Sequence, residues 1–248
     1  MATTSESGHV RNVSNFERLV AAATSFGTDY NPSKPSLALP AMQSLLASSV
    51  ESLAVLKHAV SVYDTALDAR KLAFASLNSF ITRIYNALKS SDSSNEADQS
   101  AAILVRKLRG QRASERLTTA ELETLKADGK TVKQISSSQM SFDTRLDNFD
   151  KLIHLLSSIP EYNPNEAELK VDALRNLYND LYKKNKAVIE AQVQMNKARS
   201  QRFNVLYKPL TGMIDLALDA KMYIKSVAGA GSVTYKQISG LAFRTLAN

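Results

Sequence analysis

The side chains best spaced for chemistry are Asp147, Asp150 and His154, which would share one face of a helix. Carboxylates and imidazoles on facing helices can hold metal ions in helical bundles. However, the three histidines of the chain are scattered, and no two of them are four residues apart. Contacts between residues four apart on a solvated helix face account for the three residues more simply. We therefore expect no metal site.

Residue types needed for other kinds of catalysis are missing or isolated. The chain has no cysteine, which excludes disulfides, thiolate zinc sites and a cysteine nucleophile. It has no phosphate loop, dinucleotide-binding fingerprint or nucleophile elbow, and Gly110 and Gly129 stand alone. We expect no catalytic residue and no cofactor, and hence a protein that is not an enzyme.

A run of cations in the middle of the chain could contact phosphates. Its members are Arg106, Lys107, Arg109, Arg112 and Arg116. No aromatic residues are interleaved with them, and a solvated helix end that pairs with nearby acids is the alternative interpretation. We predict at most weak, non-specific nucleic-acid binding that is lost at physiological salt, because such binding depends on counterion release.

Polar residues also interrupt two long apolar patterns. The candidates for a buried polar seam are Arg70, Asn185, Gln192 and Arg199. A polar residue in a helix seam can fix register or partner choice. A buried arginine there could hold an anionic ligand or a carboxylate. The alternative is pairing of the arginines with nearby acids, such as Asp64, Asp68 or Glu190.

The elements that would position these residues occur twice along the chain. The segment Asn15–Val20 returns as Asn148–Ile153, and Tyr30-Asn31-Pro32 returns as Tyr162-Asn163-Pro164. Further along, Ala69-Arg70 returns as Ala198-Arg199. The matches keep the same order with two small length differences, which indicates an internal duplication.

Each copy reads as a short helix, an Asn-Pro turn and a long helix. The apolar spacing predicts helices over about 11–27 and 39–89 in the first copy. The second copy has a short helix from about 142 to Pro160 and a long one over about 166–227, which Pro209 should kink or break. Between the copies, a helix is expected over 97–109, and a capping box at Thr118 predicts another that ends at Gly129.

The predicted fold class is all-α: an elongated helical bundle of two duplicated short-helix/long-helix hairpins with a helical middle insertion. The expected parts are a flexible tail (1–10), repeat A (11–90), a helical connector (91–141), repeat B (142–227) and a C-terminal tail with a short helix (228–248). A short helix covers only part of a long one. We therefore expect apolar surface that another subunit covers, and hence a homo-oligomer.

Composition and charge set limits on location and partners. The 248 residues carry a formal net charge of +7, which favours anionic partners at low salt. The N-terminal segment lacks the basic and apolar regions of a signal peptide, and no stretch of about 18 apolar residues is free of charges. We expect a cytoplasmic protein without a transmembrane segment; leaderless export stays open. The basic, amphipathic segment 221–248 could contact a membrane surface, or it could fold back onto the bundle.

Several segments carry a family resemblance. They are Met1–His9, Val105–Leu108, Ile135–Ser141 and Arg145–Leu152. Together they resemble an all-helical, internally duplicated family from Bacteroidetes bacteria to which we can attach no activity. The resemblance implies a bacterial origin and transfers no functional residue.

The most economical function is therefore that of a structural or scaffold protein. It would act through helix-mediated contacts with a protein partner or with itself. The alternatives are a membrane-active, pore-forming-like helical bundle and a basic protein that associates non-specifically with nucleic acid.

Overall fold

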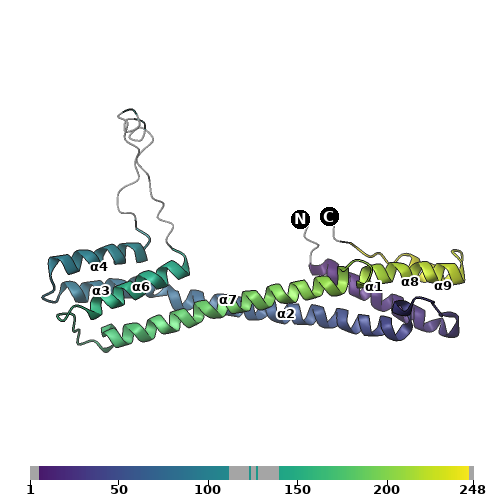
Figure 1. The fold of residues 1–248 in the computed structure, drawn as a ribbon, viewed down its shortest axis with the longest axis horizontal. Coiled ribbons are helices and arrows are strands. Elements are labelled where there is room, and N and C mark those ends of the chain that lie inside the picture. Colours follow the sequence, from purple (N-terminus) through teal and green to yellow (C-terminus); the bar gives the residue numbers. More distant parts are fainter. Residues whose placement is uncertain (1–5, 112–122, 124–126, 128–139, 246–248) are drawn as a thin grey trace. The chain divides into compact units, whose positions relative to one another are not determined.

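The computed structural model describes residues 6–111 and 140–245, together with the isolated residues 123 and 127. Every regular element in these ranges is a helix, which confirms the all-α class (Figure 1). Apart from residues 123 and 127, the helix predicted between Thr118 and Gly129 lies outside the described residues.

The chain divides into two compact units. Unit 1 combines Met1–Asp64 with Ala191–Asn248, and unit 2 is Thr65–Glu190. Both boundaries fall inside long helices of 37 residues, α2 (Leu39–Ala75) and α7 (Val171–Tyr207). The units therefore divide the chain differently from the predicted repeats, because each combines the first part of one repeat with the last part of the other.

Unit 1 is built around α1 (Glu6–Ser25) and α8 (Met213–Ala228), with α9 (Val233–Ser239) beside both (Figure 1). The core side chains of α1 recur every three or four residues, as an amphipathic helix requires; they are Val13, Phe16, Leu19, Val20 and Ala23. The helix begins at Glu6, so the expected tail over residues 1–10 is too long. The side chain of His9 is buried and contacts Tyr207, and this contact accounts for the earlier start.

Unit 2 contains α3 (Leu77–Lys89), α4 (Asn95–Leu108) and α6 (Phe142–Ser157). Figure 1 shows α4 beside both α3 and α6, and the residue contacts agree. The core joins the apolar faces of these helices to the start of α7 through residues such as Ile81, Leu108, Phe149 and Leu174. The predicted middle helix over 97–109 is thus confirmed as α4.

The two Asn-Pro turns have the same internal hydrogen bond. The hydroxyl of Tyr30 donates to the carbonyl oxygen of Leu37 at 2.9 Å, and that of Tyr162 donates to the carbonyl oxygen of Leu169 at 2.8 Å. The accepting residues end the 3-10 helices η2 (Pro35–Leu37) and η3 (Ala167–Leu169), just before α2 and α7 begin. Both tyrosines are buried, so each turn is tied to the core at the start of a long helix.

Both long helices are interrupted near their ends. The predicted helix over 39–89 has a one-residue break at Ser76, between α2 and α3. The break expected at Pro209 separates α7 from α8, and Leu210 there has a positive φ of 66°. The exposed Leu210 amide donates to the carboxylate of Asp215 at 2.7 Å. After each break, four buried positions have the same spacing: Leu77, Ile81, Ile84 and Leu88 in α3, and Met213, Ala217, Ala220 and Ile224 in α8, which also buries Ile214 and Leu216.

We expect Tyr30→Phe and Tyr162→Phe each to lower the free energy of unfolding by about 1 kcal/mol at pH 7, since a buried carbonyl loses its donor. Burial raises the pKa of both phenols to about 12, with smaller contributions from Tyr223 at Tyr30 and from Glu166 at Tyr162. Because the pKa is higher in the folded state, this stabilisation is complete below about pH 10 and is lost as the pH rises toward 12.

The Phe variants should therefore lose less stability than the wild type between pH 10 and 12 in urea unfolding experiments. Tyr182→Phe is the control, because the Tyr182 side chain is 49% exposed. A steeper alkaline loss in the Phe variants would contradict this account.

Candidate functional site

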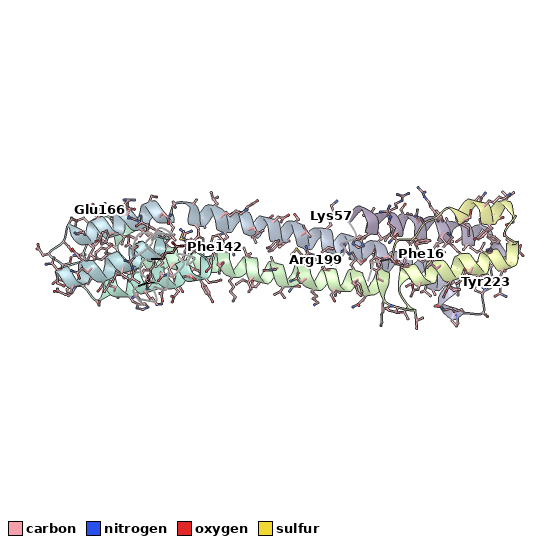
Figure 2. All side chains as sticks on the ribbon, turned by 90° about the horizontal axis from the view of Figure 1, so that it is seen from above. Phe16, Lys57, Phe142, Glu166, Arg199 and Tyr223 are labelled. Carbon is pink, nitrogen blue, oxygen red and sulfur yellow. The ribbon has the colours of Figure 1, made fainter. Side chains whose placement is uncertain are left out.

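The predicted polar seam is only half correct. Asn185 is buried and Arg70 is half-buried, as predicted. Gln192 and Arg199 are exposed, so both were assigned wrongly; Arg199 is labelled on α7 in Figure 2. The buried side of α7 instead follows Leu181, Val188, Met195 and Arg202, spaced seven residues apart. The seven-residue spacing is visible in the sequence, but the polar residues alone do not show which face of the helix is buried.

Arg70 and Asn185 belong to a short hydrogen-bonded network in unit 2. The Nη1 of Arg70 donates to the Oδ1 of Asn185 at 2.9 Å. The Nδ2 of Asn185 donates in turn to the Oδ1 of Asp143 at 2.7 Å. Two of the three acids proposed as alternative partners of the arginines have other contacts, since Asp68 lies 3.5 Å from Lys71 and Glu190 lies 3.7 Å from Lys186. A carboxylate, that of Asp143, does complete the network, and Asn185 links it to Arg70.

Two arginines flank a pair of aromatic rings beside this network. The guanidinium carbon of Arg70 lies 4.0 Å from the ring centroid of Phe142, which is labelled in Figure 2. Phe142 makes an edge-to-face contact with Phe74 at 4.9 Å, and the guanidinium carbon of Arg145 lies 5.3 Å from the Phe74 ring. Arg145 also donates to Asn78 at 3.0 Å, and its burial lowers its pKa. The attraction of the rings for these cations partly compensates for their desolvation.

The matching positions of unit 1 explain why Arg199 is exposed. In the register of the repeated segments, Arg199 corresponds to Arg70, but the position of Asn185 holds Leu53 and that of Asp143 holds Val10. No acceptor therefore occupies either position. The position of Arg145 holds Asn12, whose Nδ2 lies 3.3 Å from the hydroxyl of Tyr207. The Arg70–Asn185–Asp143 network therefore has no counterpart at these matching positions of unit 1.

A groove of about 310 Å³ lies between α6 and α7, beside the network. It is lined by Asp143, Leu146, Asp147, Asp150, Tyr178, Tyr182, Asn185, Lys186 and Ile189. The three aspartates are at the first, fifth and eighth positions of one stretch of α6, and the two tyrosines are four residues apart on α7. The groove therefore has a carboxylate wall, an aromatic wall and a buried amide.

Burial and nearby carboxylates both act on Tyr178 in the groove. Burial raises the pKa of Tyr178, and the charge of Asp150, the neighbouring Tyr182 and the charge of Asp147 raise it further. The Tyr178 and Tyr182 rings are stacked with their centroids 6.2 Å apart. Asp147 and Asp150 were singled out from the sequence, whereas Asp143, Tyr178 and Tyr182 were not. The spacing of these residues along the chain is regular, but the sequence does not show that α6 pairs with α7 and so brings them together.

The expected solvated contacts of Asp147, Asp150 and His154 are present. Asp147 lies 2.6 Å from Lys151, and Asp150 lies 3.7 Å from His154. Within residues 6–111 and 140–245, no group of three or more His, Cys, Asp and Glu side chains is arranged to hold a metal ion.

The basic run is only partly described. Arg106, Lys107 and Arg109 lie at or just after the end of α4 and are half-buried, and Arg109 donates to the hydroxyl of Thr82. Arg112 and Arg116 lie outside the described residues.

The described part of the C-terminal segment folds back onto unit 1. The Nζ of Lys221 donates to the carbonyl oxygens of Ser239 and Leu241 at 3.0 and 2.7 Å, and burial lowers its pKa. Asn12 bonds to both the N–H and the C=O of Arg244, each at 2.9 Å. This packing agrees with the folding-back alternative for residues 221–248 up to residue 245.

Searches of protein-family models, curated proteins and solved structures found no match to this chain.

We predict that Asn185→Leu, which copies Leu53 of unit 1, lowers the free energy of unfolding by about 1–3 kcal/mol, because it leaves a guanidinium donor and a carboxylate without their partner. The triple variant Arg70→Met, Asn185→Leu, Asp143→Val should recover much of this loss, because a complete polar network can be replaced by apolar side chains at little cost. Chemical unfolding followed by circular dichroism measures both.

Gln192→Leu is the control and should change stability little, since Gln192 is exposed. A triple variant less stable than Asn185→Leu would show that the network itself is strongly stabilising.

Proposed function

We propose that the chain is a non-enzymatic scaffold protein that binds other proteins, or copies of itself, through its long helices. The main support is the exposed apolar character of α2. The stretch Leu39–Lys89, counted through the break at Ser76, contains an 18-residue window that is apolar enough to cross a membrane and only 17% buried. A core helix of the same composition would be mostly buried.

Two exposed valines define this surface within unit 1. Val55 and Val62 are 39% and 45% exposed. Val55 and Val62 are seven residues apart and so lie on the same face of α2. On the inner side of α2, Leu56 packs with Met195 and Ala198. This face is therefore separate from the core-forming side of the helix and available to a partner.

We infer that the fold arose by internal duplication, and this inference favours self-association. Its support is the matched hydrogen bonds of Tyr30 and Tyr162 and the shared spacing of buried residues in α3 and α8. Each compact unit uses parts of both repeats. A single ancestral repeat could therefore complete a unit only by pairing with a second copy.

A membrane-active role is the second candidate, and the same stretch of α2 supports it. An amphipathic or apolar helix can enter a bilayer interface when its apolar face is free. Glu51 and Lys57 interrupt the stretch, however, and charges are costly inside a bilayer. We therefore favour the protein-contact role.

We expect the wild-type chain to form a homo-oligomer at tens of micromolar in light-scattering measurements. The variant Val55→Gln, Val62→Gln should weaken self-association by about tenfold or more, because each valine removed from a symmetric interface loses roughly 1–2 kcal/mol of apolar burial per subunit. The matched control is Val227→Gln on α8, where the valine is 48% exposed.

A wild-type chain that stays monomeric and captures no protein partner would count against the scaffold role. Sedimentation of the wild type with lipid vesicles, lost in the double variant, would favour the membrane-active role instead.

A further inference from the structure

We propose that the groove between α6 and α7 binds an organic cation, namely an alkylguanidinium or alkylammonium group. This proposal does not depend on the scaffold role, because the groove belongs to unit 2 and uses none of the valines of the α2 surface. Its volume of about 310 Å³ falls at the small end of the range for ligand pockets in proteins.

The carboxylate wall favours an extended cation over a single metal ion. Asp143, Asp147 and Asp150 are separated by four and then three residues on α6. Their backbone positions therefore span about 10 Å along the helix axis, at 1.5 Å per residue. This span is too long for three carboxylates to coordinate one ion at the roughly 2–2.6 Å that calcium and magnesium require. It suits a chain with one or more positive groups along its length.

The aromatic wall offers a second type of attraction to the same ligand. Tyr178 and Tyr182 present stacked rings, and a guanidinium or ammonium group binds to an aromatic face within about 6 Å of its centre. The hydroxyl groups of the tyrosines can also accept hydrogen bonds from such a ligand. Carboxylates on one helix and aromatic rings on the next thus complement both the charge and the N–H donors of an organic cation.

The buried amide of Asn185 holds one wall in place before any ligand binds. Arg70 donates to its Oδ1, so its Nδ2 must face Asp143, to which it donates at 2.7 Å. The side chain of Asn185 is only 4% exposed, and this fixed amide orients the Asp143 carboxylate at the edge of the groove. A preorganised carboxylate loses less conformational freedom when a cation binds.

Unit 1 indicates that helix packing alone does not require this set of residues. In the register of the repeats, the positions of Asp143 and Asp147 hold Val10 and Ser14, and those of Tyr178 and Tyr182 hold Leu46 and Val50. Only Asp150 has an acidic counterpart, Glu17. The same short helix and long helix meet in unit 1 without the acidic and aromatic walls, so these walls are an addition specific to unit 2.

Two lysines, one lining the groove and one beside it, do not neutralise its carboxylates. Lys186 lies 3.7 Å from Glu190, which does not line the groove, and Lys151 lies 2.6 Å from Asp147. These are exposed ion pairs, which contribute little stability and exchange readily. An incoming guanidinium or ammonium group can therefore replace them at Asp147.

The test is isothermal titration calorimetry of the full chain at low salt with two probes, spermidine and a tetra-arginine peptide. The chain carries a net charge of +7, so its overall field repels both probes, and binding requires a local anionic site. We expect Asp147→Asn, Asp150→Asn to weaken binding by about tenfold or more and Tyr182→Ala to weaken it about threefold. Circular dichroism checks that each variant is folded.

The matched control is Glu17→Gln, at the position of unit 1 that corresponds to Asp150, and it should leave affinity unchanged. Tighter binding of the peptide would identify a basic side chain of a protein as the natural ligand, and tighter binding of spermidine would identify a free polyamine. The proposal fails if neither probe binds, if the Asp147/Asp150 variant binds as the wild type does, or if Glu17→Gln weakens binding equally. Should the double aspartate variant not fold, the exposed Tyr182→Ala decides, because unchanged affinity in that variant would refute the aromatic wall.

Discussion

A helix of 37 residues is about 55 Å long, whereas the short helices of this chain, with 20 and 16 residues, span only about 30 and 24 Å. A long helix cannot bury its apolar side against one short helix. In this fold, the short helix that precedes each long helix covers its first part, and elements from the other repeat accompany its last part. This mismatch in length explains why each compact unit contains residues from both halves of the sequence, and why part of α2 remains exposed.

The two units show how one helical arrangement tolerates different interiors. In unit 1 the positions matching the charged network hold Leu53 and Val10, and a neutral contact joins Asn12 to Tyr207. In unit 2 the network joins a guanidinium, an amide and a carboxylate. A buried polar network is costly unless each of its groups is satisfied. The Nε atoms of Arg70 and Arg145 have no hydrogen-bond partner among the described residues, so aromatic contacts compensate only in part.

Much of the fold followed from local sequence signals. The turns at Tyr30 and Tyr162, the break at Pro209 and the helix that became α4 were all predicted, because Pro, Gly and apolar periodicity act over short distances. The start of α1 was predicted too late, because the burial of His9 depends on Tyr207, which is far away in the sequence. The residues of the candidate site were harder to predict from the sequence. The exposure of Arg199 depends on how the helices pair, and no pattern around Arg199 in the sequence shows it.

Two hydrogen bonds between the side chain of Asn12 and the backbone of Arg244 hold the two ends of the described chain side by side in one unit. Because these two described segments are held together, the order of residues 6–111 and 140–245 along the chain matters little to the packing. A short linker could join the ends, and the chain could open between α4 and α6, so that α6 to α9 come first and α1 to α4 follow. Every helix would keep its neighbours, and the new chain would be a circular permutant of the present one. The fold is thus defined by which segments pair, and only weakly by where the polypeptide begins.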